Sequence, residues 1–351
     1  MEARALATAF RRGRQGYLMR IGLIGVGRIG AFHAGTLRAL PGVDSVIVTD
    51  SDLTRARAVA GELGTEVAAS ARDVLEAGVD ALVIAAPTST HPDLIICGVN
   101  AGLPVFCEKP VARDVAGTLE VIKSVNGRAN RVQIGFQRRF DAGFLAAREA
   151  ARSGTLGWLH TIRSTTLDAA PPPAAYIPAS GGIFRDCAVH DFDAIRWVTG
   201  REVVRVYAAG ANLGAGFFRE AGDADTAAAV LTLDDGTLAV VSCGRYNAAG
   251  YDVRLELLGS RGSVCAGLDG KMALRSTQPG ESFPSASAHR HFMERFRDAY
   301  AGELAAFTEL AAGHAESPCT LEDALQASYI AEACELSRRR DQPVALAEVR
   351  Q

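Results

Sequence analysis

The sequence predicts an α/β protein of two domains, the first of them a doubly wound parallel sheet with helices on both faces. Two patterns in the first half predict this class. Short apolar runs alternate there with amphipathic segments of helical length, and the first apolar run leads through a glycine-rich turn into the first helix. The length of 351 residues and a shift in composition after residue 138 indicate a second domain. We expect the domains to cover residues 19–137 and 138–351.

The glycine-rich turn Gly25-Val26-Gly27-Arg28-Ile29-Gly30 joins the apolar run 21–24 to a helix that ends near Leu40. Gly25 permits a tight turn, Gly27 lets the backbone approach a pyrophosphate, and Gly30 lets the helix lie close to the strand. The helix N-terminus then offers backbone N–H groups to an anion. This context predicts a Rossmann domain whose cofactor contacts include Gly25, Gly27, Arg28, Ile29 and Gly30.

Asp50 ends the second predicted strand, residues 45–50, and lies 20 residues after Gly30. A carboxylate at this point accepts hydrogen bonds from the adenosine ribose and repels a 2′-phosphate. Asp52 adds negative charge, so we expect NAD in preference to NADP. Asp50 could instead cap the following helix, and both roles are possible if Asp52 is the cap.

The rest of the first half continues the alternation. Helices are expected at 53–63, 71–76, 91–101 and 115–125, and strands at 66–68, 81–85, 104–107 and 131–135.

Polar residues follow three of these strands, where the carboxyl ends of parallel strands meet at one edge of a sheet. Lys109, held between a strand end and Pro110, is the most informative, because a lysine there can donate or accept a proton. A solvated surface lysine is the alternative. The candidate cofactor contacts at this edge are Ala86, Pro87, Thr88, His91, Glu108, Lys109 and Gln137.

The second half begins with a helix at 142–153 and a strand at 159–166. Asp186, His190 and Asp193 are spaced i, i+4 and i+7, which places them on one face of a predicted helix. His190 suits a general base, because a histidine titrates near neutral pH. A surface carboxylate–imidazole contact is the alternative. Further strands are expected at 201–210, 226–233, 237–243, 251–256 and 262–266, and helices at 290–312 and 321–338.

These residues together resemble the glucose-fructose oxidoreductase/inositol dehydrogenase/rhizopine catabolism (Gfo/Idh/MocA) family. The resemblance rests on Gly25–Gly30 with His33, on Pro87-Thr88 with His91, on Glu108-Lys109-Pro110 and on the segment 180–193. It implies a C-terminal α/β domain with an open, mainly antiparallel sheet that often mediates oligomer contacts. It also implies a nicotinamide-dependent reaction at a carbinol of a sugar, an inositol or a similar polyol, with Lys109, Asp186 and His190 as the catalytic set.

The segment 165–173 resembles the proline-rich loop of bacterial inositol 2-dehydrogenases, except that Leu167 stands where a more polar residue is common. We therefore expect NAD-dependent oxidation of a secondary hydroxyl of myo- or scyllo-inositol, or of a related cyclic polyol, to the ketone. An aldose or amino-sugar derivative is the alternative substrate, and a non-catalytic NAD-binding sensor is the alternative of another class. The candidate substrate contacts are Lys109, Arg139, Asp168, Asp186, His190 and Tyr251.

Bulk properties narrow the cellular context. A net charge of −3 gives no support for a nucleic-acid partner, and no apolar run reaches the roughly 20 residues of a membrane helix. The seven cysteines form no C-x-x-C pair, which is typical of a reducing, cytoplasmic setting. His289, His291 and His314 lack ligand partners at metal spacing, so we expect no metal. We expect a homodimer or homotetramer, and we interpret residues 1–18 as a disordered or mis-annotated extension before Met19.

Overall fold

The computed structural model describes residues 18–350, which form two compact units. The first unit comprises the chain up to Gly135 together with Tyr300–Ala324, and the second comprises Phe136–Ala299 together with the chain from Leu325 onward. This division differs from the predicted one, because residues 300–324 return to the first unit and Gln137 belongs to the second. The interpretation of residues 1–18 concerns a segment that lies outside the described residues, apart from Leu18.

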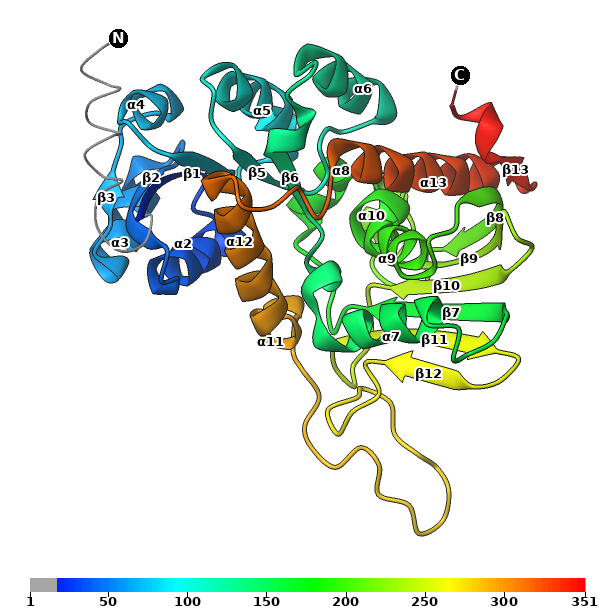
Figure 1. The fold of residues 1–351 in the computed structure, drawn as a ribbon. Helices are drawn as coiled ribbons and strands as arrows, with labels where there is room; N and C mark the ends of the chain where they lie inside the picture. Colours follow the sequence, from blue (N-terminus) through cyan, green and yellow to red (C-terminus); the bar gives the residue numbers. More distant parts are fainter. Residues whose placement is uncertain (1–17, 351) are drawn as a thin grey trace. The chain divides into compact units, whose positions relative to one another are not determined.

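The first unit contains a six-stranded parallel sheet in the order β3-β2-β1-β4-β5-β6, which confirms the doubly wound prediction (Figure 1). Its strands are β1 Met19–Ile24, β2 Val43–Thr49, β3 Glu66–Val67, β4 Ala81–Ile84, β5 Val105–Glu108 and β6 Val132–Gly135. Its helices are α2 Arg28–Ala39, α3 Leu53–Leu63, α4 Ala71–Glu76, α5 His91–Asn100 and α6 Val115–Ser124, with short 3-10 turns at Thr88–Thr90 and Ala129–Arg131.

The core of the first unit explains why residues 300–324 belong to it. The central strands are apolar on both faces, and every residue of β4 is fully buried. Helix α12, Arg297–Ala312, contributes Leu304, Phe307 and Leu310 to the same cluster as Leu23 and Phe106. Burying these three side chains stabilises the unit by about 1.5–3 kcal/mol each.

The second unit contains a seven-stranded sheet in the order β12-β11-β7-β10-β9-β8-β13. Only the neighbours β7 and β10 are parallel, which confirms the expected mainly antiparallel sheet. The strands are β7 Leu159–Leu167, β8 Val203–Ala211, β9 Thr226–Leu233, β10 Leu238–Gly244, β11 Asp252–Gly259, β12 Ser263–Ala266 and β13 Val344–Ala345.

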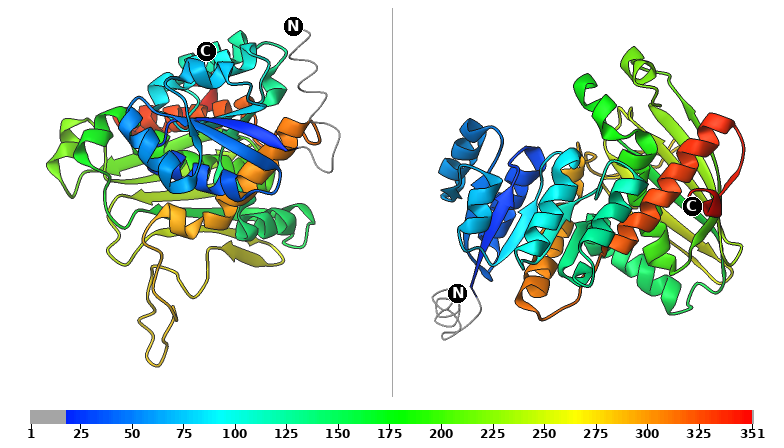
Figure 2. Two further views of the ribbon diagram at one scale, coloured as in Figure 1. Left: turned by 90° about the vertical axis from the view of Figure 1, so that its left-hand side faces the viewer. Right: turned by 90° about the horizontal axis from the view of Figure 1, so that it is seen from above.

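Helices cover one face of this second sheet, and the other face is exposed (Figure 2). Along β9 the side chains of Ala227, Ala229 and Leu231 are buried, whereas the intervening Val230 is exposed. The helical segments are α7 Ala142–Arg152, α8 Ile177–Ser180, α9 Val189–Thr199, α10 Gly216–Glu220, α11 Phe292–Arg295 and α13 Leu321–Arg340, with short turns at Gln137–Phe140, Ala174–Tyr176, Phe184–Ala188 and Leu346–Glu348. Within residues 18–350 no helix combines the length and apolar character of a membrane span.

Candidate active site

The glycine-rich turn lies between β1 and α2, as predicted, and each glycine has a different surrounding. Gly25 has a φ of +91°, and a Cβ there would lie 2.6 Å from the carbonyl oxygen of Ala85. A Cβ on Gly30 would lie 1.9 Å from the carbonyl oxygen of Gly25, so only glycine fits. A Cβ on Gly27 would meet no protein atom within 4 Å. Gly27 is the N-cap residue of α2 and, as a glycine, has no side chain that could accept hydrogen bonds from the N–H groups of the first helical turn. The open space beside this helix N-terminus therefore fits a phosphate group.

Asp50 follows β2 and accepts two backbone hydrogen bonds from residues that flank the site. The N–H of Val26 donates to its Oδ2 (2.8 Å) and the N–H of Asp52 to its Oδ1 (2.9 Å). Burial raises the pKa of Asp50, but these bonds and the charge of Arg55 lower it more, so its pKa lies below the ordinary value. Asp52 caps α3 by accepting from Thr54 and Arg55, which resolves the capping alternative in favour of Asp52.

Lys109 lies at the end of β5 between two residues that buried histidines hold in place. Nε2 of His33 is 2.7 Å from Oε1 of Glu108, and Nδ1 of His91 is 2.7 Å from the carbonyl oxygen of Pro110. Both imidazoles are buried. The backbone on either side of Lys109 is therefore fixed, and the two histidines act as supporting residues.

The loop after β4 carries Ala86, Pro87 and Thr88 to the same edge of the first sheet as the loop after β5. Nε2 of His91 lies 2.8 Å from the carbonyl oxygen of Ala86, so this histidine joins the two loops. Thr88 begins a 3-10 turn that leads into α5. The predicted cofactor contacts of the first unit thus gather at the carboxyl ends of β1, β4 and β5, where ligands bind in doubly wound sheets.

The second unit carries Asp186 and His190 on a continuous helical segment that begins with an unpredicted π-helical turn, Phe184–Ala188. Asp186 lies within this turn, and His190 lies in the first turn of α9. Both side chains are partly exposed, and the ring of Phe136 packs edge-on against His190 at 5.6 Å. A π-helical turn is wider than an α-helical turn and often marks a functional site.

Asp193 has different surroundings from those of Asp186 and His190, although it lies three residues after His190 in the same α-helix. Asp193 is buried and accepts two hydrogen bonds from Arg139, from Nε at 2.9 Å and from Nη2 at 2.5 Å. The π-helical turn that holds Asp186 departs from the α-helical spacing on which the predicted common face rests. Arg139 is itself buried in this bidentate ion pair, so its geometry favours anchoring α9 over the predicted substrate contact.

The remaining predicted residues lie in different surroundings. Tyr251 is buried, with Phe296 edge-on at 6.5 Å. Burial raises the pKa of Tyr251 and Asp168 raises it further, although Arg138 opposes them, so the phenol remains a neutral donor. Gln137 is buried in the short turn that opens the second unit.

Asp168 and Asp186 are joined by an arginine that sequence reasoning missed. The guanidinium of Arg245 donates from Nη1 to Oδ2 of Asp168 (2.9 Å) and from Nη2 to Oδ2 of Asp186 (2.6 Å). The Tyr176 hydroxyl donates to Oδ1 of Asp186 (2.9 Å). The strand order was the missing signal, because β7 and β10 are parallel neighbours and their ends place Asp168 beside Arg245.

Two chemical conclusions follow from these arrangements. The first unit offers backbone N–H groups and an open space to a dinucleotide phosphate. The second offers a fixed carboxylate, an imidazole and hydroxyl-binding groups, which suit a polyol. Among residues 18–350 no group of three or more His, Cys, Asp or Glu side chains could hold a metal ion.

Comparisons with known proteins agree with the fold and the cofactor. Residues 19–136 match the model of the oxidoreductase family with an NAD-binding Rossmann fold, and residues 144–265 match that of the GFO/IDH/MocA C-terminal domain. The chain is 38% identical to the myo-inositol dehydrogenase Hyg17 of Streptomyces leeuwenhoekii, over 90% of this chain and 96% of the relative.

Solved structures are similar over nearly the whole chain. A myo-inositol dehydrogenase from Corynebacterium glutamicum aligns with a TM-score of 0.86 at 34% identity, covering 94% of this chain and 99% of the other. The scyllo-inositol dehydrogenase from Lactobacillus casei, solved with NAD(H) and scyllo-inositol, aligns with a TM-score of 0.84 at 30% identity and the same coverage. The chain therefore belongs to the GFO/IDH/MocA family of oxidoreductases and carries that family's NAD-binding Rossmann domain.

Proposed function

We propose that this protein oxidises one secondary hydroxyl of myo- or scyllo-inositol, or of a related cyclic polyol, to the ketone with NAD as the acceptor. The observation that carries this proposal is similarity along nearly the whole chain to inositol dehydrogenases, including one solved with NAD(H) and scyllo-inositol bound. The predicted catalytic residues agree with it, because the chain supplies a lysine, a carboxylate and a histidine.

In the proposed mechanism, His190 takes the proton from the substrate hydroxyl and Lys109 stabilises the developing alkoxide. Asp186 orients His190 and accepts a hydrogen bond from the substrate. Bound NAD supplies the hydride acceptor. Asp168 is the second candidate contact for the polyol, and the buried phenol of Tyr251 is the third.

The choice of NAD over NADP rests on Asp50. Its low pKa keeps it ionised, and its two backbone hydrogen bonds fix it beside the glycine-rich turn. A fixed negative charge at this position repels a 2′-phosphate. Arg55 lies 3.4 Å from Asp50 and reduces this repulsion only in part, because half of its side chain is in contact with solvent.

We further propose that the protein is a cytoplasmic homodimer or homotetramer. The exposed face of the second sheet carries Tyr207, Val230 and Val240 side by side on β8, β9 and β10, which is an apolar row that a second copy would cover. All seven cysteines are free thiols, as a reducing compartment allows. Light scattering of the wild type and of Val230→Asp tests the assembly, and a wild-type monomer would contradict it.

The activity is tested by mixing the protein with NAD and a panel of polyols and following NADH by its absorbance. NADH formation with myo- or scyllo-inositol is the expected result. Formation only with aldoses or amino sugars would replace the proposed substrate, and its absence with every substrate, together with measurable NAD binding, would indicate a sensor.

A further inference from the structure

Arg245 connects two carboxylates that come from distant parts of the second unit. It follows β10, and its side chain is 5% exposed. Asp168 follows β7, the parallel neighbour of β10, and its N–H donates to the carbonyl oxygen of Gly244 (2.8 Å). Asp186 belongs to the π-helical turn. One guanidinium thus fixes the end of a strand to the turn that leads to His190.

The charges around Arg245 favour its role as a fixed cation. Burial lowers the pKa of the guanidinium, but the neighbouring Cys187, Asp186 and Asp168 raise it more, so its pKa lies above the ordinary value. The groups that face it are Asp168 from the end of β7, Asp186 and Cys187 from the π-helical turn and, by its charge, Asp223 from the segment before β9.

Both oxygens of Asp186 accept hydrogen bonds from side chains of the second unit. Arg245 donates to Oδ2, and Tyr176 donates to Oδ1. Two donors on different oxygens fix the plane of the carboxylate. The orientation of Asp186 is therefore set by the protein.

We propose that Arg245 is a positioning residue for the reaction: it holds Asp186 in one orientation and keeps it negatively charged, and Asp168 anchors the other side of the guanidinium. This proposal rests on the proposed function, which assigns Asp186 to the reaction.

The effect expected from removing Arg245 follows from the charges of the groups that remain around it. Without Arg245, Asp168 and Asp186 would be two carboxylates near each other without the cation that now joins them, and like charges favour protonation of one. His190 lies four residues after Asp186 on the same helical segment, so loss of the cation should also favour the protonated form of its imidazole. Both effects move the acid side of the pH–rate profile in the same direction, toward higher pH.

The test uses Arg245→Met, which keeps an unbranched apolar stem and removes the guanidinium and its charge. We expect kcat/KM for the polyol to fall about 100-fold, because Asp186 loses its orientation. The acid limb of the kcat/KM profile moves up by about one pH unit or more, and NAD affinity is unchanged. Arg245→Lys restores the position of the limb but not the rate, because an ammonium cannot reproduce the fork that joins both carboxylates.

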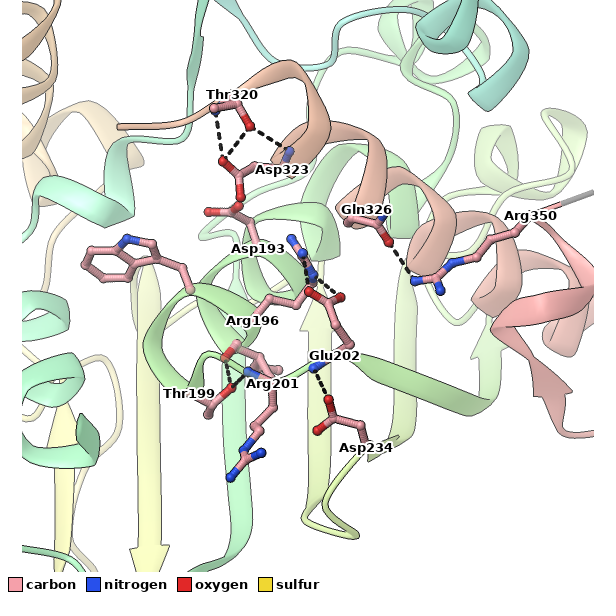
Figure 3. Close-up of polar contacts among 12 residues, drawn as sticks. Asp193, Arg196, Thr199, Arg201, Glu202, Asp234, Thr320, Asp323, Gln326 and Arg350 are labelled. Carbon is pink, nitrogen blue, oxygen red and sulfur yellow. Dashed lines mark hydrogen bonds and ion pairs between the residues drawn. The ribbon is translucent and has the colours of Figure 1, made fainter. Parts of the chain in front are cut away.

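A matched control is available in the same unit. Arg196 on α9 makes a similar bidentate pair with Glu202, at 2.8 Å from Nε and 2.6 Å from Nη2 (Figure 3). Arg196→Met removes an arginine–carboxylate pair far along the helix from Asp186, so it lowers stability without moving the pH profile. A shift of the limb in Arg196→Met as large as that in Arg245→Met would overturn the proposal.

The remaining outcomes separate the inference from the proposed function. If Asp186→Asn keeps wild-type turnover, the catalytic assignment itself fails. If Asp186→Asn loses turnover and Arg245→Met keeps the wild-type rate and profile, only the inference about Arg245 is overturned. If Arg245→Met does not fold, Arg245→Lys decides: a reduced rate with unchanged NAD affinity supports the inference, and a wild-type rate overturns it.

Discussion

The two units differ in how far protein contacts already hold the proposed ligand-binding groups in place. The turn Gly25–Gly30 in the first unit leaves open space next to Gly27, where backbone groups can meet a ligand. Asp186 in the second unit has partners for both carboxylate oxygens before any substrate arrives. The first site is thus complete only when a ligand binds, whereas the charged groups of the second are already oriented. Removing one member of a buried ion pair from the second unit should therefore lower the free energy of unfolding more than removing one member of an exposed pair from the first.

The largest effect is expected at the buried pair Arg138–Asp191. Arg138 donates to Asp191 at 2.8 Å, and both side chains are almost fully buried. Arg138→Met leaves a buried carboxylate without its cation, so the free energy of unfolding should fall by about 3–5 kcal/mol. Urea unfolding followed by circular dichroism measures the change. Arg72→Met, which removes the exposed pair with Glu76 in the first unit, is the control and should leave the unfolding midpoint in place.

Lys109→Ala should give the next largest effect. The proposed role of its ammonium is to stabilise the alkoxide, and loss of such a donor lowers kcat by about 100- to 1000-fold. Steady-state rates with myo-inositol measure it, with NAD affinity as the control for folding of the first unit. Wild-type turnover in this variant would remove Lys109 from the mechanism.

Two glycine variants distinguish a glycine that the packing of the fold requires from a glycine that leaves room for the cofactor. Gly30→Ala places a Cβ against the backbone of Gly25, so we expect a loss of stability of about 1–3 kcal/mol. Gly27→Ala meets no protein atom and keeps an allowed backbone, so it should keep stability and weaken NAD binding. Thermal unfolding and NAD titration of both variants distinguish the two. Unchanged NAD affinity in Gly27→Ala would show that the open space is not used by the cofactor.

Asp50→Ser should have the smallest effect. It removes the charge that repels a 2′-phosphate and leaves Arg55 nearby. We expect the preference for NAD over NADP to narrow by about tenfold, which corresponds to about 1.4 kcal/mol. Dissociation constants for both cofactors measure the preference, and a variant as selective as the wild type would show that Asp50 is not its source.

Local patterns allowed the first unit to be predicted closely. The helix 53–63 has the predicted bounds, because Asp52 caps its start and Gly64 ends it in a left-handed conformation. The return of residues 300–324 to this unit was missed, because it depends on packing between segments far apart in the sequence.

The second unit was harder to predict at its site. The spacing of Asp186, His190 and Asp193 fits a regular α-helix, and nothing in that spacing indicates a π-helical turn. Arg139 resembled a polyol contact until its partner Asp193 was known. Arg245 was missed because its two carboxylate partners, Asp168 and Asp186, lie 77 and 59 residues away in the sequence. For Arg139 and Arg245, the identity of the charged partner depends on contacts between residues that are far apart in the sequence.

The most direct test of the account is a paired measurement on His190→Ala, in which NAD affinity and the rate of NADH formation from myo- and scyllo-inositol are determined on one preparation. Under the proposed function, the cofactor binds to the first unit and the proton is transferred by the second. We therefore expect nearly unchanged NAD affinity and a rate lowered by about 100-fold or more. A wild-type rate, or a loss of NAD affinity that accounts for the lower rate, would contradict it.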